Sequence, residues 1–224
     1  MALSCDAILF DLDGVLVDSE AVVQGRWRRW AEDRDIPFEE VEAVHTGRPA
    51  IEVIEEVAPH LDPETEVERL GTEMATDTEE LSAFDGAQAL LRRLPEDQWA
   101  IATSGRHSTA TSRLAQVGLP EPKVLVTADD VDRGKPDPEP YRRAAEQLGL
   151  DPGRCVVLED APAGVEAARR AGASVLGVAT AMPPAALEAA TAVVPQLNAV
   201  AVHSEGEELR VDWRCHVETR EGES

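Results

Sequence analysis

The sequence is poor in positive charge, and lysine is its scarcest basic residue. It contains 44 Asp and Glu residues against 21 Lys and Arg, which gives a formal net charge of −23 at pH 7. A surface of this sign repels phosphate backbones and anionic lipid headgroups, so we expect neither nucleic acid nor a membrane as a partner. The only lysines are Lys123 and Lys135. Any step that needs an ammonium group therefore has just two candidates.

Cysteines and long apolar runs are also scarce. Cys5, Cys155 and Cys215 are three residues at wide spacings, which fits neither a disulfide framework nor a cysteine-rich zinc site. No apolar run approaches the ~20 residues that span a bilayer, and the N-terminus lacks the basic region and apolar stretch of a signal peptide. We therefore expect a cytoplasmic protein in a reducing environment.

The apolar residues that are present form short runs separated by helical patterns. Five runs predict buried strands: Ala7–Phe10, Trp99–Ala102, Val124–Val126, Val156–Leu158 and Val175–Val178. Three stretches that end at a glycine predict helices: Ser108–Val117, Pro138–Leu148 and Pro162–Ala171. This alternation predicts an α/β fold with a parallel sheet covered by helices on both faces.

Residues 18–82 interrupt this alternation. They contain no β-branched run and read as helices punctuated by proline and glycine, so they predict a helical insertion, after which the sheet resumes near Phe84. The first helix is expected at Glu20–Arg34, where Trp27 and Trp30 follow a helical spacing typical of packing inside the insertion.

The insertion divides the core in two, and a further segment follows the core. Residues 1–17 and 83–203 are expected to form the α/β core. Residues 204–224 form an acidic C-terminal extension in which only Leu209, Val211 and Trp213 alternate as a strand does. This extension either adds an edge strand to the sheet or is a loose tail.

Carboxylates follow two of the predicted strands, at the edge where ligands bind in open α/β sheets. Asp11 and Asp13 follow the first strand, and Glu159 and Asp160 follow a later one. Paired carboxylates can divide the roles of nucleophile and general acid/base if a divalent cation such as Mg²⁺ offsets their repulsion. The alternative for Asp160 is to cap the helix that begins at Pro162.

Two further strand ends carry groups suited to an anion. Thr103, Ser104 and Gly105 offer a hydroxyl and backbone N–H groups ahead of a helix, which is either an anion cradle or a plain loop. Lys135, between Gly134 and Pro136, is placed to neutralise a phosphoryl group as a point charge; the alternative is an ordinary surface lysine.

In this order, the strand-end residues resemble the four motifs of the haloacid dehalogenase-like hydrolases. The resemblance covers about residues 6–200 and rests on four segments: Asp11-x-Asp13-Gly14, Thr103, Gly134-Lys135-Pro136, and Glu159-Asp160 followed by Gly164-Val165-x-Ala167-Ala168. It implies a Rossmann-like core with the 18–82 insertion as a small α-helical cap, of the kind found in β-phosphoglucomutase-like and sugar-phosphate phosphatase members.

The resemblance also implies catalytic roles. Asp11 is the nucleophile that forms an aspartyl-phosphate, and Asp13 is the acid/base that serves the leaving group and then water. Thr103 and the Ser104 N–H hold phosphoryl oxygens while Lys135 offsets their charge. The metal-site residues, for Mg²⁺ as cofactor, are Asp11, Asp13 through its backbone carbonyl, and Asp160, with Glu159 in or next to that shell.

Residues for substrate binding follow from position. The core offers Ser104, Gly105, Arg106 and His107, and the cap offers the cluster His45-Thr46-Gly47-Arg48, of which His45 and Arg48 are the candidates, although His45 is equally typical of local packing.

The leading hypothesis is a Mg²⁺-dependent phosphatase of small glycerol, hexose or deoxyhexose phosphates, working as a monomer or homodimer. A hexose-phosphate mutase is the alternative. The resemblance speaks against it, because a β-phosphoglucomutase has a histidine in its first cap helix at the position of Val23, which is apolar here. A non-catalytic phosphosugar-binding module is a third hypothesis. The presence of Asp11 speaks against it, because a binding module needs no nucleophile.

Overall fold

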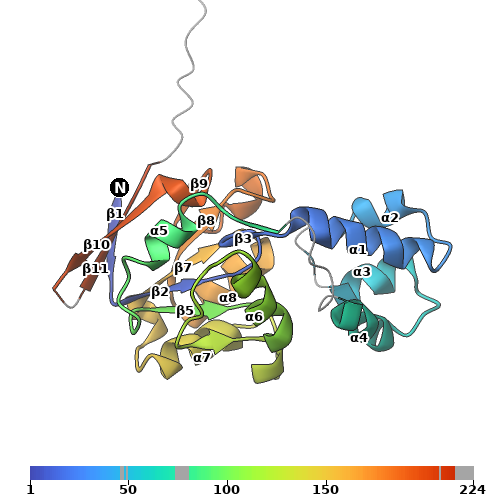
Figure 1. Ribbon diagram of the computed structural model, residues 1–224, viewed down its shortest axis with the longest axis horizontal. Coiled ribbons are helices and arrows are strands. Elements are labelled where there is room, and N and C mark those ends of the chain that lie inside the picture. Colours follow the sequence, from blue (N-terminus) through green and yellow to red (C-terminus); the bar gives the residue numbers. More distant parts are fainter. Residues whose placement is uncertain (46–47, 49, 74–80, 207, 215–224) are drawn as a thin grey trace, which may run out of the picture.

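The computed structural model describes residues 1–45, 48, 50–73, 81–206 and 208–214. Thr46, Gly47 and Cys215 of the sequence analysis lie outside these residues, as does the rest of the C-terminal stretch 215–224. Figure 1 shows an α/β core, a group of helices to one side of it and a small antiparallel sheet on the opposite side.

A six-stranded parallel sheet forms the centre of the core, in the order β6-β5-β2-β7-β8-β9. Its strands are β2 (Ala7–Phe10), β5 (Trp99–Ala102), β6 (Leu125–Val126), β7 (Cys155–Glu159), β8 (Ser174–Val178) and β9 (Ala192–Val194). Five of these match the predicted apolar runs, so the parallel sheet is confirmed. β9 was not predicted, because Ala192–Val194 is too short a run to stand out.

Helices cover both faces of the sheet, as predicted. In β2, Ala7 and Leu9 pack with α7 (Glu139–Gln147) and α8 (Pro162–Ala171), whereas Ile8 and Phe10 pack with α5 (Ala87–Leu91) and α6 (His107–Gln116). This follows from the alternation of side chains along a strand, and every residue of β2 is buried because both faces are covered. Short 3₁₀ helices lie at η1 (Ala128–Asp130), η2 (Pro152–Arg154), η3 (Pro184–Leu187) and η4 (Leu197–Ala199).

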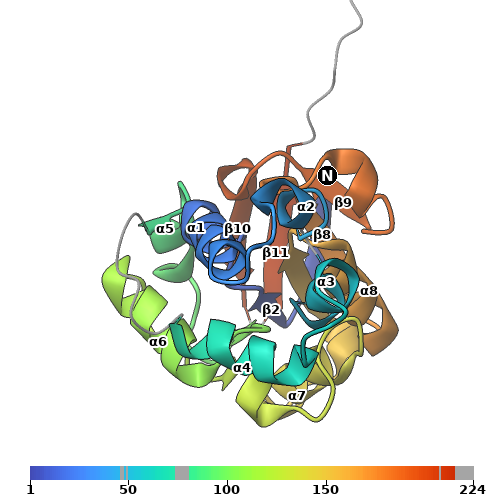
Figure 2. The same cartoon turned by 90° about the vertical axis from the view of Figure 1, so that its right-hand side faces the viewer.

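The helical insertion forms a cluster with its own apolar core (Figures 1 and 2). Its helices are α1 (Glu20–Glu32), α2 (Phe38–Glu42), α3 (Ala50–Val57) and α4 (Pro63–Glu73). Trp27 and Trp30 pack edge to face in it, with ring centroids 5.4 Å apart, and both are buried. We call α1–α4 the cap.

The chain enters and leaves the cap through one pair of short strands. β3 (Val17–Asp18) pairs antiparallel with β4 (Ser82–Ala83), so both crossings lie side by side. The expectation that the sheet resumes near Phe84 is wrong, because α5 follows β4 and the next strand of the six-stranded sheet begins at Trp99. Sequence patterns missed β3 and β4 because two residues each show no periodicity.

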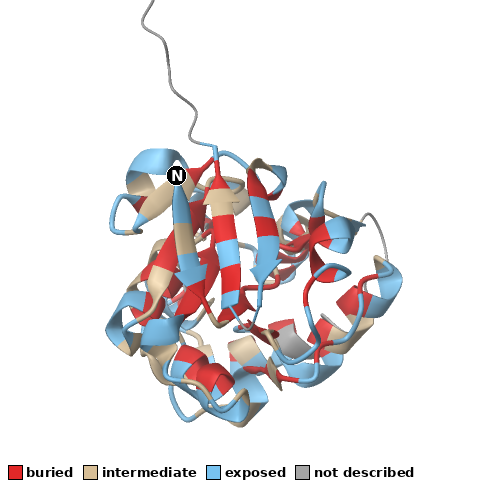
Figure 3. Cartoon of the chain, turned by 90° about the vertical axis from the view of Figure 1, so that its left-hand side faces the viewer, coloured by how far each residue is buried: buried red, intermediate tan, exposed pale blue. Residues whose placement is uncertain are grey.

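The C-terminal segment up to Arg214 is neither an edge strand of the main sheet nor a loose tail. β10 (Val200–Glu205) and β11 (Glu208–Trp213) form a hairpin, and β1 (Ala2–Cys5) pairs with β11 to make a separate three-stranded sheet. Leu209 and Val211 face the core, which gives the alternating buried and exposed bands of Figure 3. β10 thus runs across the expected boundary between residues 203 and 204.

The two cysteines of the described chain, Cys5 and Cys155, are buried free thiols. Burial raises the pKa of each to about 12, so neither is a good nucleophile at neutral pH. Within the described residues, no helix combines the length and apolar character required to cross a bilayer.

Candidate active site

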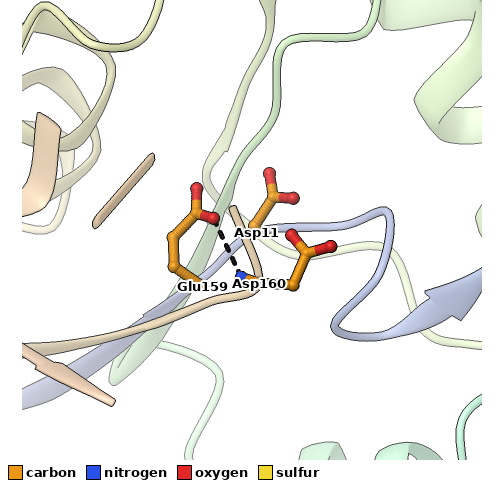
Figure 4. A group of neighbouring side chains, drawn as sticks. All are labelled: Asp11, Glu159 and Asp160. Atoms are coloured by element: carbon orange, nitrogen blue, oxygen red, sulfur yellow. Dashed lines mark hydrogen bonds between the residues drawn. The ribbon is translucent and has the colours of Figure 1, made fainter. Parts of the chain in front are cut away.

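Three buried carboxylates meet at the carboxyl ends of two neighbouring strands. Asp11 follows β2, Glu159 ends β7, and Asp160 comes next in the chain. Because Phe10 pairs with Leu158 in the parallel ladder, the residues that follow them emerge side by side. One oxygen of each carboxylate lies within 4.8 Å of the others, and Figure 4 shows the three side chains grouped at this edge.

Lys135 joins two of these carboxylates. Its Nζ donates to Asp11 Oδ1 and to Glu159 Oε1, both at 2.6 Å, and its side chain is only 7% exposed. Burial lowers the pKa of the Lys135 ammonium, but the charges of Asp11 and Glu159 outweigh burial and raise it above its ordinary value. Lys135 is therefore a permanent cation in contact with Asp11.

Glu159 already has hydrogen-bond donors on both of its oxygens. Oε1 accepts from Lys135 and from the Tyr141 hydroxyl at 2.7 Å, while Oε2 accepts from the backbone N–H groups of Asp160 and Ala161 at 3.0 and 3.1 Å. The alternative that Asp160 caps α8 is not what the structure has, since α8 has Ala161 as its N-cap residue without a side-chain cap. Glu159 instead satisfies the N–H groups ahead of that helix.

Tyr141 is a site residue that the sequence analysis missed. It lies on α7, is fully buried, and its ring lies 5.0 Å from Lys135 Nζ. Burial and the neighbouring Glu159 raise its pKa well above the ordinary value. The hydroxyl therefore keeps its proton and donates a hydrogen bond to Glu159. The available signal was weak, because a tyrosine on a buried helix face is ordinarily a core residue.

Asp11 and Asp160 are the acidic groups that gain most from a cation. Burial raises the pKa of Asp11 to about 7; Lys135 opposes this rise and the charge of Glu159 adds to it. Burial, then the charges of Glu159 and Asp11, raise the pKa of Asp160 well above its ordinary value. The local environment therefore disfavours two adjacent carboxylates unless positive charge is close to them.

The donor set of the cluster suits a magnesium ion. Mg²⁺ prefers oxygen ligands and takes one or two carboxylates together with water and phosphate. Asp11 and Asp160 fit this requirement, whereas the oxygens of Glu159 already accept four hydrogen bonds. The Asp13 carboxylate forms an ion pair with Arg113 through Oδ1, which fits the expectation that Asp13 offers a metal its backbone carbonyl.

The turn that carries Asp13 depends on a glycine. Gly14 has a φ of +79°, and a Cβ at this position would lie 1.9 Å from Asp160 Oδ2. The Thr180 hydroxyl, beyond the end of β8, donates to the Gly14 carbonyl at 2.5 Å and fixes the turn from the other side. Thr180 was not predicted, because nothing near it in the sequence marks a strand-end motif.

The predicted phosphate loop follows β5. Thr103 is buried, and its hydroxyl oxygen accepts from the Gly105 N–H at 3.0 Å. Ser104, Arg106 and His107 are exposed, and α6 begins at His107. The loop thus stands at the same sheet edge as Asp11, since β5 and β2 are parallel neighbours.

Comparisons with known proteins agree with this geometry. Residues 5–172 match a model of the haloacid dehalogenase-like hydrolase family. The chain belongs to the haloacid dehalogenase-like hydrolases. It is 44% identical over 181 residues to hexitol phosphatase A of Escherichia coli, covering 79% of this chain and 84% of that protein. It is 36% identical to glycerol-1-phosphate phosphohydrolase 2 of Saccharomyces cerevisiae, covering 80% and 77%.

Solved structures share the fold of this chain. A hydrolase from Pseudomonas syringae has a TM-score of 0.75 and 29% identity, covering 87% of this chain and 94% of that one. A family member from Deinococcus radiodurans, solved with bound phosphate and sodium, has a TM-score of 0.65 and 29% identity, covering 87% and 92%.

The two substrate-binding candidates of the cap, His45 and Arg48, contact other cap residues. The His45 ring lies against Trp27, with centroids 6.2 Å apart, and burial lowers its pKa. Arg48 forms ion pairs with Glu56 at 2.7 Å and Glu52 at 3.8 Å on α3. Within the described residues, neither side chain has a hydrogen bond or ion pair to Asp11, and their substrate-binding role stays a prediction.

We predict that Gly164→Ala destabilises the protein although it lies in a helix. A Cβ at Gly164 would lie 1.7 Å from Glu159 Oε1, so Glu159 must move and lose its contact with Lys135. We expect the free energy of unfolding, measured in urea, to fall by roughly 1–3 kcal/mol.

Gly25→Ala in α1 is the matched control, because a Cβ there meets nothing within 4 Å. It should stabilise the protein by about 0.5–1 kcal/mol, the ordinary effect of alanine in a helix. Equal stabilisation by both substitutions would contradict the tight packing of Glu159 against Gly164.

Proposed function

We propose that this protein is a Mg²⁺-dependent phosphatase that hydrolyses small sugar or polyol phosphate monoesters through an aspartyl-phosphate on Asp11. The observation that carries the proposal is the contact of Asp11 with Lys135, at a sheet edge that also holds Asp160. The relatives named above are phosphatases of a hexitol phosphate and of glycerol 1-phosphate, which supports the substrate class.

In the first step, an Asp11 carboxylate oxygen attacks phosphorus and the bond from phosphorus to the ester oxygen breaks. Asp13 gives its proton to that oxygen, so the product leaves as a neutral alcohol. Lys135, Thr103 and the Ser104 N–H hold the phosphoryl oxygens as negative charge gathers on them. Lys135 keeps its contact with Asp11 throughout, which fixes the nucleophile in place.

In the second step, water hydrolyses the aspartyl-phosphate. Asp13, now a carboxylate, takes a proton from the water while the water oxygen attacks phosphorus. The bond between phosphorus and the Asp11 oxygen breaks, and inorganic phosphate forms. The same side chain thus acts as acid and then as base, so Asp13 returns to its protonated state for the next cycle.

Asp11, Asp160 and the Asp13 backbone carbonyl are the groups we assign to Mg²⁺, with Glu159 positioning Lys135 beside them. When bound, the ion supplies positive charge that stabilises the negative phosphoryl group and orients it. Glu159 suits its position because it holds Lys135 and Tyr141 on one oxygen.

Substrate selection is assigned to the surface around this edge. Arg106 and His107 at the start of α6 are exposed, and His45 and Arg48 in the cap are the candidates from the other side. The partner is a small phosphorylated metabolite, and nucleic acid and membranes are not expected. The protein works as a monomer or homodimer in the cytoplasm.

A hexose-phosphate mutase is the second candidate function, since the family resemblance includes β-phosphoglucomutase-like proteins. Val23 argues against it, because its apolar side chain packs against the cap core and has no proton to transfer. A mutase would isomerise β-glucose 1-phosphate in the presence of a bisphosphate primer and release little phosphate.

We predict turnover of at least one ester in a panel of hexitol, glycerol, hexose and deoxyhexose phosphates assayed with Mg²⁺. Replacing the nucleophile in Asp11→Asn should lower kcat by about 1,000-fold or more, because the amide cannot form the phosphoenzyme. Phosphate release and β-glucose 1-phosphate isomerisation are measured in parallel. Turnover of no ester, full activity of Asp11→Asn, or isomerisation without phosphate release would each overturn the proposal.

Mg²⁺ binding should also depend on pH. Because the pKa of Asp11 in the metal-free protein is about 7, the group is largely protonated at pH 6 and must lose its proton to bind a cation. We expect the apparent affinity for Mg²⁺ to rise from pH 6 to pH 8, and binding at pH 6 to release protons, since the pKa of Asp160 is raised as well. Calorimetry in two buffers of different ionisation enthalpy measures this release. An affinity that is constant with pH, with no proton released, would contradict the assignment.

A further inference from the structure

One charged residue occupies an apolar position on α6. Ala110, Leu114 and Val117 follow the i, i+4, i+7 spacing of the helix face that packs on the core, and Arg113 stands on the same face at i+3. Its side chain is only 3% exposed. A full positive charge is thus buried where the helix pattern calls for an apolar residue.

The guanidinium of Arg113 is directed at Asp13. Its Nη1 forms an ion pair with Asp13 Oδ1, the one ion pair of Arg113 within the described residues. Its Nε and Nη2 are buried and have no hydrogen-bond partner in that part of the chain. Arg113 therefore makes far fewer contacts than its five N–H groups allow, and the contact it makes is with the predicted acid/base.

Stability of the fold does not account for this arginine. A buried ion pair is commonly no more stabilising than a well-packed apolar residue of similar volume, because desolvation offsets the attraction. The unpartnered N–H groups add to that penalty. A methionine or leucine at position 113 would complete the apolar face of α6, so the arginine is best explained by its effect on Asp13.

We propose that Arg113 is the positioning residue of Asp13, an inference that rests on the proposed function. The Oδ1 atom of Asp13 is buried against Arg113, whereas the side chain as a whole is 29% exposed. Arg113 thereby anchors one oxygen and leaves Oδ2 to exchange a proton with the ester oxygen and then with water.

The charges at the site are then divided between two cations. Lys135 faces Asp11 and Glu159, and Arg113 faces Asp13. While Asp13 is a carboxylate, between the two steps, four carboxylates, counting Asp160, against two cations leave a net charge of 2 − 4 = −2, which one divalent ion offsets. Arg113 holds Oδ1 of Asp13 in both steps without exchanging a proton itself.

The test compares Arg113→Met with the wild type on the best ester of the panel. If Arg113 positions Asp13, kcat should fall by about 100-fold while KM changes by less than about twofold, because a displaced acid/base slows chemistry and not binding. Arg113→Lys, which keeps the charge, should restore part of the loss. Thr109→Val, a buried substitution on the same helix, should leave kcat unchanged.

A double-mutant cycle with Asp13→Asn identifies the route of the effect. Once Asp13 is replaced, Arg113→Met should lower kcat no further. A further fall in that background, an unchanged kcat of Arg113→Met alone, or a failure of Arg113→Met to fold would overturn the inference, since each makes the arginine merely structural.

Crystal structures of the wild type and of Arg113→Met separate this inference from the proposed function. If the wild type hydrolyses no ester, the proposed function fails, and the position of Asp13 still decides the role of Arg113. A carboxylate displaced in the variant supports the inference, and an unmoved carboxylate overturns it.

Discussion

The ammonium group of Lys135 is bonded to carboxylates from two neighbouring strands, and the rest of the site depends on this contact. Parallel pairing of β2 with β7 brings Asp11 and Glu159 side by side, where their charges repel. A buried ion pair that loses one partner destabilises a protein by about 3–5 kcal/mol. Lys135 therefore has to stay in place for the two acids to remain buried together.

Small residues make this arrangement possible. Gly14 and Gly164 stand where any side chain would collide with Asp160 or with Glu159, and Gly14 also takes a left-handed conformation. Tyr141 and the N–H groups ahead of α8 complete the hydrogen bonds of Glu159. The geometry is thus set by the backbone as well as by the charged groups.

The sequence predicted the features that are local and missed those that are not. Apolar runs such as Ala7–Phe10 predict buried strands, and the polar residues directly after them indicate the site. The pairing of β1 with β11 joins segments from opposite ends of the chain, and no local pattern encodes it. Arg113 and Tyr141 were missed because each lies inside a helix and reaches the site through the fold. The expected boundary between residues 203 and 204 was misplaced, because β10 runs across it.

The chain offers an internal control for the central contact, because it has only two lysines. Lys123 is 61% exposed and pairs with Glu96 on the surface, whereas Lys135 is buried in the site. The most direct measurement is kcat of Lys135→Met and of Lys123→Met at saturating Mg²⁺. The account predicts a fall of about 100-fold or more for Lys135→Met and no change for Lys123→Met. Equal activity in the two variants would contradict it.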